Sequence, residues 1–331
     1  MKLKSALKKA MSLLPKDKGT VFYKVRFIKS PSSIFVTDGL CSSVVKVDDD
    51  IFDFLCEASV LVNAVKDKGD FSFTVEGDGS VKLNTDSNSY TLIGEDISSF
   101  PSPIFSDGSL FGDADILGLN NVIYAASKTA KNDGLPYIHF TNTYVEATDR
   151  VRLAKFLIDF PWEGLLPVDL FNKWPKKASS IGFYFDGYRC FFMIGDEVRY
   201  AFPLGDKYPD TTVATTLGDN KSCVVVSRKS LLETIKQASE VSKISGVLLS
   251  FGETLEVRAL DRESVSYAYL GYVMTEGEGT GCDVSVSGKS LSQCLRNIKS
   301  SEISCYYGEY PSPLVLRGGD TLVYIWPMFN G

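Results

Sequence analysis

Residues 144–156 read YVEATDRVRLAKF, a stretch in which one acidic and two basic side chains stand together between two strand-like apolar runs. An acidic residue between two such runs predicts a β-hairpin with Asp149 in its turn. One interpretation makes Asp149, Arg150 and Arg152 the centre of an active site. The other makes Asp149 a turn residue whose carboxylate bonds to its own backbone.

The same pattern occurs at two other places in the chain. SIFVTDGLCSSVVKV contains Asp38, and LEVRALDRESVSYAYL contains Asp261, so the three aspartates are 111 and 112 positions apart. A fixed period of this length indicates a repeated structural unit. Three copies of a structural turn need no chemistry, whereas three active sites in one chain would be unusual. The repeat therefore favours the structural interpretation of Asp149.

The material around the hairpins repeats as well. A helix is predicted before each hairpin, at residues 4–14, 116–130 and 229–242, and another after it, at residues 51–65, 168–174 and 289–298. Ser227 is a plausible N-cap for the helix that begins near residue 229. Each second helix precedes a further pair of strands, and the short links make the strands antiparallel. The sequence thus predicts three α+β domains of one design, at residues 1–106, 113–210 and 219–331.

Composition excludes several classes of function. The 331 residues are 44% hydrophobic and 23% charged, with a net charge of −6, and no apolar run reaches the roughly 18–20 residues of a membrane span. The seven cysteines include no CxxC pair, which is typical of reduced thiols in a cytoplasmic protein. The single histidine, His139, lies in a predicted strand without a cluster of ligands. We therefore expect no catalytic residue, metal, cofactor or membrane partner.

Positive charge is concentrated on the predicted helices. Residues 2–18 contain six lysines and one aspartate, and Lys229, Lys236 and Lys243 are seven apart on one helical face. A solvated helix face is one explanation. The other is a surface that faces a polyanion, because the rest of the chain is acidic and would repel nucleic acid.

The repeat resembles the sliding clamps, and the bacterial form, the beta subunit of DNA polymerase III, is the nearer match. EATDRVRLAKF resembles the family's second-domain segment Ala-Thr-Asp-Gly-His-Arg-Leu-Ala. YTLIGEDISSFPSP resembles the end of the family's first domain, LGDKYPDT the end of its second, and VYIWPMFNG its closing strand. The resemblance covers the whole chain and implies three tandem clamp domains, each with two helices packed on antiparallel sheets, in a ring-forming fold.

The family's architecture implies a head-to-tail homodimer that closes around duplex DNA. Helices line the hole of the ring. Because the closed ring itself retains the DNA, weak contacts with phosphates that do not depend on base sequence are sufficient for sliding. Phe100, Tyr269 and Leu270 are the residues expected at the subunit contact. The basic side chains expected to face DNA are Lys4, Lys8, Lys9, Lys128, Lys173, Lys177, Lys229, Lys236, Arg296 and Lys299.

The resemblance also implies a groove between the second and third domains, where the DNA polymerase, the clamp loader and other proteins dock short, partly apolar peptides. A last buried strand is the simpler explanation of VYIWPMFNG. The matching motifs place in the groove Thr148, Arg152, Leu153, Pro209, Val213, Tyr324, Trp326, Pro327 and Met328.

This chain departs from the family pattern in three places. Arg150 and Val151 replace Gly-His, Trp326 replaces a smaller apolar residue, and the ending FNG replaces a basic and apolar one. These changes bear on the peptide preference of the groove, and with the short chain they suggest a divergent, phage-encoded clamp. Two other functions stay open: an open, monomeric DNA-binding scaffold of the same design, and an enzyme with a site near Asp149.

Overall fold

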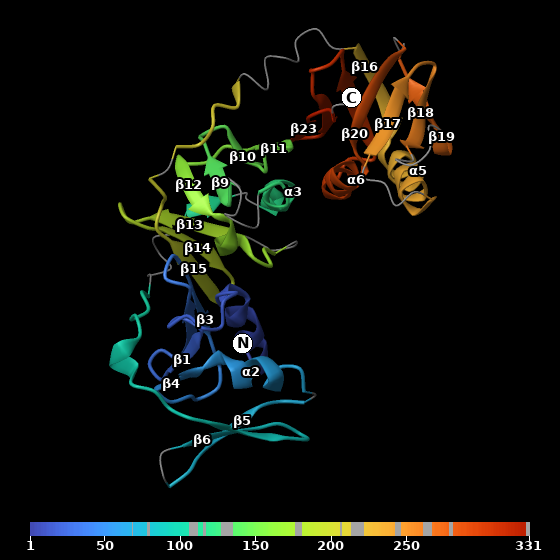
Figure 1. Cartoon of the computed structure of the whole chain (residues 1–331). Helices are drawn as coiled ribbons and strands as arrows, with labels where there is room; N and C mark the ends of the chain where they lie inside the picture. Colours follow the sequence, from blue (N-terminus) through green and yellow to red (C-terminus); the bar gives the residue numbers. More distant parts are fainter. Residues whose placement is uncertain are drawn as a thin grey trace. The chain divides into compact units, whose positions relative to one another are not determined.

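The computed structural model describes residues 1–67, 69–77, 80–105, 112–114, 117–126, 135–175, 181–205, 207–212, 222–241, 246–260, 267–277 and 281–328. The chain forms two compact units (Figure 1). The first contains residues 1–117 and 166–204, and the second contains residues 118–165 and 205–331. The second predicted domain is therefore divided between the two units.

The first unit is built on an antiparallel sheet with the strand order β4-β1-β2-β3-β15-β14-β13-β8. Its strands are β1 (Lys24–Ile28), β2 (Ser33–Thr37), β3 (Cys41–Lys46), β4 (Phe54–Glu57), β8 (Gly112–Ala114), β13 (Ile181–Phe185), β14 (Cys190–Ile194) and β15 (Glu197–Ala201). The pairing of β3 with β15 joins strands from the first and second predicted domains. A smaller sheet contains β5 (Ser72–Val75), β6 (Val81–Asn84) and β7 (Ser89–Leu92).

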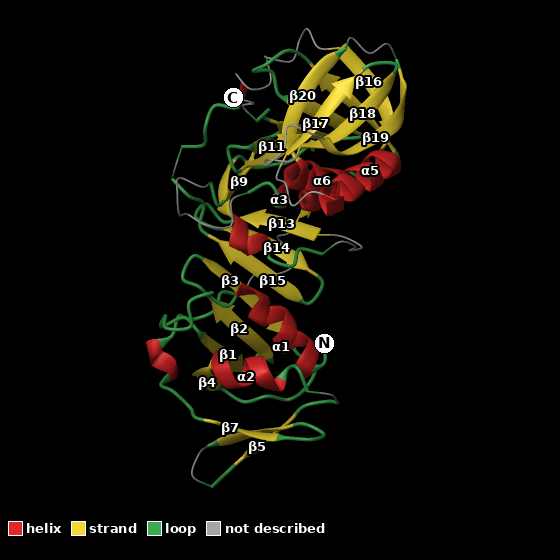
Figure 2. Ribbon diagram, turned by 45° about the vertical axis from the view of Figure 1, so that its right-hand side comes forward, coloured by secondary structure: helices red, strands yellow, loops and turns green. Residues whose placement is uncertain are grey.

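Helices α1 (Leu3–Ala10) and α2 (Ala58–Ala64) lie on one face of the first unit's large sheet (Figure 2). Helix α1 buries Leu3, Ala6, Leu7 and Ala10, which recur at helical spacing. Among the described residues of this unit, the short 3-10 segments are η1 (Met11–Leu13), η2 (Ile97–Ser99) and η5 (Val168–Phe171).

The second unit contains an antiparallel sheet with the order β12-β9-β10-β11-β23-β22-β21-β16-β19-β18-β17-β20. Its strands are β9 (Tyr137–Phe140), β10 (Tyr144–Thr148), β11 (Arg152–Leu157), β12 (Gly164–Pro167), β16 (Ser222–Ser227), β17 (Gly246–Phe251), β18 (Thr254–Leu260), β19 (Tyr267–Glu276), β20 (Cys282–Ser287), β21 (Glu302–Tyr307), β22 (Leu314–Gly318) and β23 (Thr321–Ile325). The pairing of β11 with β23 joins the second and third predicted domains.

Three helices of the second unit pack together. Helix α5 (Arg228–Val241) packs against α6 (Gly288–Asn297), and α6 also contacts α3 (Asn120–Ile123), which follows the 3-10 segment η4 (Leu117–Leu119) (Figures 1 and 2). Leu231, Ile235 and Ala238 of α5 are fully buried, as their spacing predicts. Helices α5 and α6 both begin at serine N-caps. Ser227 and Ser287 accept hydrogen bonds from the backbone N–H groups three residues later.

The α+β class and the antiparallel hairpins are confirmed, and several helix boundaries differ from the prediction. Residues 54–57 lie in β4 rather than in the predicted helix 51–65, because Leu55 pairs with Arg26 of β1. Residues 168–171 form a 3-10 turn rather than a longer helix. In the described part of the predicted helix 116–130, only residues Asn120–Ile123 (α3) are α-helical. The three domain boundaries remain a prediction. No helix among the described residues is long and apolar enough to cross a bilayer.

Candidate protein-binding site

The Asp149 turn is held by backbone hydrogen bonds. The Asp149 Oδ1 atom accepts hydrogen bonds from the N–H groups of Val151, at 3.1 Å, and Arg152, at 3.0 Å. The Thr148 hydroxyl donates to the Arg152 carbonyl at 2.6 Å and accepts from the Arg150 N–H at 3.0 Å. This carboxylate is used as a turn acceptor, which is the structural role that the repeat favours.

Arg152 connects this turn to two helices. Its Nε atom lies 3.1 Å from the Asp149 carboxylate. Its two terminal nitrogens donate to Gln293 of α6, at 2.8 Å, and to the carbonyl of Tyr124 at the end of α3, at 3.1 Å. The side chain is 8% exposed. Arg152 therefore acts inside the unit, where it stabilises the turn against the helices.

No nucleophile is activated beside this turn among the described residues. The Cys294 thiol lies in the surroundings of Arg152, and burial raises the pKa of this thiol to about 11. Burial also raises the pKa of the Tyr124 hydroxyl well above its usual value. Both groups stay protonated at neutral pH, so neither supplies the anion that nucleophilic catalysis requires.

Leu153, Tyr324 and Trp326 come together on one face of the second unit's sheet. Leu153 is paired with Tyr324 across β11 and β23, and the Trp326 N–H donates to the Val151 carbonyl at 3.0 Å. The cluster also contains residues that the sequence did not single out: Val315, Tyr306 and Leu322. We call these six side chains the apolar cluster. Strand register brings them together, and register between distant strands is not visible in one sequence.

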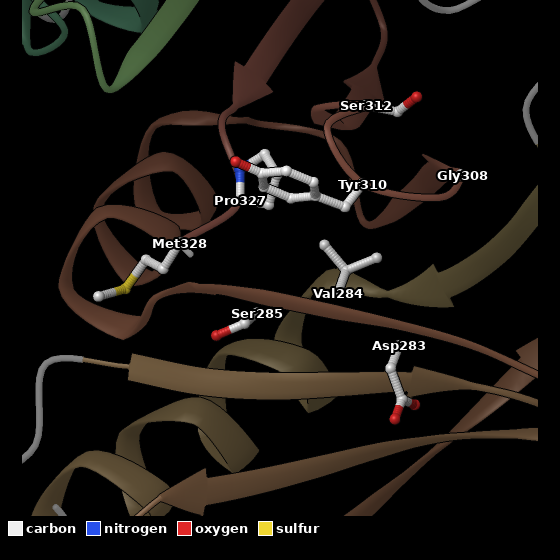
Figure 3. A pocket seen from close by; sticks show the side chains of 8 residues that line it. All are labelled: Asp283, Val284, Ser285, Gly308, Tyr310, Ser312, Pro327 and Met328. Carbon is white, nitrogen blue, oxygen red and sulfur yellow. The ribbon is translucent and has the colours of Figure 1, made fainter. Parts of the chain in front are cut away.

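Pro327 and Met328 continue from Trp326 into a pocket of about 210 Å3. Figure 3 shows the ring of Tyr310 beside Pro327, with Met328 at one end and Asp283 at the other. The Met328 N–H donates to the Ser285 carbonyl at 2.7 Å, which holds this segment against β20. The other lining residues are Val284, Gly308 and Ser312. Tyr310 is 63% exposed, and an aromatic residue next to Pro311 is the signal in the sequence that could have identified this wall.

Two predicted groove residues lie on the link between β15 and β16, residues 202–221. Pro209 is exposed, and Val213 lies outside the described residues. Thr148 is buried, with its hydroxyl engaged in the turn. The structure therefore brings five of the predicted residues to a continuous segment or cluster, namely Leu153, Tyr324, Trp326, Pro327 and Met328.

The basic side chains predicted to face DNA differ in their surroundings. Six of them are exposed: Lys8, Lys173, Lys229, Lys236, Arg296 and Lys299. Lys4 donates to the Gly69 carbonyl at 2.8 Å, and its ammonium lies 5.1 Å from the centre of the Phe71 ring. Lys9 donates to the Ile194 carbonyl at 3.0 Å and lies 3.3 Å from the fully buried Glu197 carboxylate. Lys128 and Lys177 lie outside the described residues.

The residues predicted at the subunit contact lie in the core of the first unit and on strand β19 of the second. The Phe100 ring is 5% exposed and packs edge-on against Phe35 inside the first unit, with 5.7 Å between the ring centres. Tyr269 and Leu270 lie on β19, opposite Ala259 and Arg258 of β18, and their side chains are outside the described set.

Comparison with known proteins gives matches among solved structures and none among family models or curated sequences. Among solved structures, the sliding clamp of Bacillus subtilis has a TM-score of 0.81 at 16% identity and covers 99% of this chain and 97% of its own. The beta subunit of DNA polymerase III from Thermotoga maritima has a TM-score of 0.80 at 19% identity, with 100% and 98% covered.

The beta subunit from Streptococcus pyogenes has a TM-score of 0.77 at 18% identity, with 98% and 97% covered. These similarities extend over nearly the full length of both chains, although the sequences have diverged widely. The chain therefore has the fold of the bacterial DNA polymerase sliding clamps.

Proposed function

We propose that this protein is a sliding clamp, a non-catalytic processivity factor that encircles duplex DNA and tethers a DNA polymerase. The observation that carries the proposal is the match to bacterial sliding clamps over 98–100% of the chain, with TM-scores of 0.77–0.81 for the three structures above. The Asp149 carboxylate is engaged by the backbone of its own turn, and this supports a non-catalytic role over the enzyme hypothesis.

DNA is held in this proposal by topology, so its contacts with phosphates can be weak. The exposed side chains Lys229 and Lys236 of α5, together with Arg296 and Lys299 at the end of α6, supply such contacts. Positive charge that is concentrated on several helices in a chain of net charge −6 favours DNA at those helices over the rest of the surface. Lys4 and Lys9 are engaged inside the first unit and contribute less.

Partner proteins dock in this proposal on the apolar cluster and the adjoining pocket. An aliphatic or aromatic side chain of a partner peptide packs against the partly exposed Trp326, which rests on the buried Leu153, and the chain of the peptide continues over Pro327 and Met328. A thioether adapts to anchors of different shapes. One of the similar structures, a sliding clamp from Pseudomonas aeruginosa, is described as bound to griselimycin, which makes this compound a suitable probe.

Closure of a ring requires a second copy of the chain, and we propose a head-to-tail homodimer that a clamp loader opens. An open, monomeric DNA-binding scaffold is the alternative, because exposed lysines on the helices suit both forms. The two differ in what happens when DNA has no free end, since an open form can leave sideways and a closed ring cannot.

The test threads the protein onto linear duplex DNA through its free ends, so that no loader is needed, and then joins the ends with ligase. We expect the protein to remain on the circle in high salt and to leave after a single cut by a restriction enzyme. DNA that is left linear is the control and should lose the protein in high salt. Equal loss from the circular and linear DNA would reject the ring and favour the open scaffold.

A further inference from the structure

A buried charged network lies on the β9–β11 part of the second unit's sheet. Glu146 of β10 is 1% exposed, and its carboxylate lies 3.0 Å from the ammonium of Lys155 on β11. The Nδ1 atom of His139 on β9 lies 2.8 Å from the same carboxylate. Glu146 pairs with both strands directly, opposite Lys155 on one side and His139 on the other. The chain's single histidine therefore belongs to this network.

The network extends from the sheet to the link. The Thr211 hydroxyl donates to the Glu146 carboxylate at 2.9 Å and accepts from the Lys155 ammonium at 3.1 Å. Three groups thus form a closed triangle, in which a buried carboxylate and a buried ammonium share one hydroxyl. Buried charges are costly unless all their hydrogen-bonding positions are filled, so Thr211 has a fixed place in this arrangement.

A second contact anchors the link nearby. The ring of Tyr208 stacks on the ring of His139, with 4.6 Å between the ring centres. Burial raises the pKa of the Tyr208 hydroxyl, and the Glu146 carboxylate raises it further. The contacts of Tyr208 and Thr211 lie on either side of Pro209 and Asp210, so both ends of this short exposed segment are fixed to the sheet.

Strand register relates the network to the apolar cluster. Glu146 and Thr148 are two residues apart on β10, and Lys155 and Leu153 are two residues apart on β11, so each pair lies on one face of the sheet. Tyr324 is paired with Leu153, and Leu322 with Lys155. The network and the apolar cluster are therefore neighbouring rows on the same face, and the link crosses that face beside the cluster.

We propose that Glu146, Lys155 and Thr211 are positioning residues that hold the link as one wall of the partner-binding groove. This inference rests on the proposed function, because it assigns the apolar cluster to partner docking. The network fixes the backbone on which Pro209 is exposed and so keeps the groove open and shaped before a partner arrives. A preformed wall lowers the ordering cost of binding.

The test substitutes Thr211→Val, which removes the shared hydroxyl and keeps the shape of the side chain. The matched control is Thr234→Val on α5, since Thr234 is also 9% exposed and donates a single hydrogen bond, to the Ser230 carbonyl. Release of the link is measured by acetylation of Tyr208 with N-acetylimidazole, quantified by mass spectrometry. Tyr188, which is 77% exposed, provides the internal reference.

We expect Thr211→Val to raise the rate of Tyr208 acetylation by about tenfold, because two charged groups lose a hydrogen-bonding partner. Thr234→Val should leave the rate unchanged, and Thr211→Ser should restore it. The affinity for griselimycin, measured by surface plasmon resonance, should fall by a similar factor in Thr211→Val. It should stay unchanged in Thr211→Ser and Thr234→Val.

An unchanged acetylation rate in Thr211→Val would overturn the anchoring role of the network. Faster acetylation with unchanged griselimycin affinity would overturn its role in positioning the groove. Failure of the unsubstituted protein to bind griselimycin would count against the docking groove itself, whereas the acetylation rates would still report on the network. The two failures are therefore distinguishable.

Discussion

At the scale of single residues, one aspartate turn occurs at least three times with the same hydrogen bonds. The Asp38 Oδ1 atom accepts from the N–H groups two and three residues later, at 2.9 and 2.6 Å. Asp149 does the same, and so does Asp186, at 2.8 and 2.6 Å. The residue after each aspartate has a positive φ, with Arg150 at 71° where the other two turns have glycine. Asp261, the third member of the sequence repeat, lies outside the described residues.

The Asp38 and Asp186 turns differ in their electrostatics. Burial raises the pKa of Asp38. Burial acts in the same direction on Asp186, but the N–H donors of the turn and the Arg189 guanidinium, 2.8 Å away, outweigh it and lower the pKa. The ionised form of Asp38 therefore opposes folding. Because the pKa of Asp38 is raised in the folded state, the stability that its protonated form contributes is lost as pH rises through that folded-state pKa. Ionised Asp186 favours folding, and that stability is lost as pH falls through its lowered value.

Asparagine keeps the turn acceptor and removes the charge, so we expect opposite effects at neutral pH. Asp186→Asn should lower the free energy of unfolding by about 1 kcal/mol because the pair with Arg189 is lost. Asp38→Asn should leave it unchanged or raise it. Urea unfolding of both variants at pH 7 and pH 4 measures this, and the gap between the two variants should narrow at pH 4. A loss of the same size in both variants would contradict the assigned pKa directions.

At the scale of elements, helix α5 has one face for the core and one for solvent. Leu231, Ile235 and Ala238 are fully buried, while Lys229 and Lys236 are exposed. The seven-residue spacing predicted this division correctly, because a helix repeats its direction every two turns. Lys9 shows the limit of the same method. Its place on α1 resembles that of an exposed lysine, but Glu197 of β15 comes from far along the chain to pair with it.

The exposed lysines of α5 should contribute to DNA affinity through phosphate contacts. Lys229→Ala with Lys236→Ala should lower the slope of log affinity against log salt concentration by about 2 for duplex DNA. Fluorescence anisotropy of a labelled duplex over a range of NaCl concentrations measures the slope. Alanine favours the helix, so the fold should persist.

The control for this experiment is Lys29→Ala with Lys46→Ala, which removes the same charge from exposed lysines of the first unit's sheet region. Its slope should match that of the unsubstituted protein. If both double variants changed the slope equally, the contribution of α5 would be one of net charge alone.

At the scale of the whole molecule, the proposed ring requires a dimer. We expect static light scattering to give twice the mass of one chain across the micromolar range. Leu270→Asp should shift the mass toward that of a single chain, because a charge on β19 opposes an apolar subunit contact. Phe100→Ala is a poorer probe, since Phe100 is packed within the first unit and its loss destabilises that core. A compact monomer at every micromolar concentration would contradict the closed ring.

The period near 111 residues and the alternating strands were sufficient to predict an α+β repeat and the turn role of Asp149, because local hydrogen bonding and hydrophobic periodicity act within short segments. The apolar cluster could be predicted only in part. Leu153 and Trp326 were identified by resemblance, whereas Val315 and Tyr306 join them through the pairing of β11, β23, β22 and β21.

The sequence by itself determined the repeat, the antiparallel hairpins and the helices with a clear apolar face. Only the tertiary structure decided which strands pair across the predicted domains, how Arg152 is used, and that Glu146, Lys155 and Thr211 meet. The physical reason is that local propensities depend on neighbours in the chain. A buried charge, in contrast, is stable only beside partners that folding brings together, and Lys155 and Thr211 are 9 and 65 residues from Glu146 in sequence.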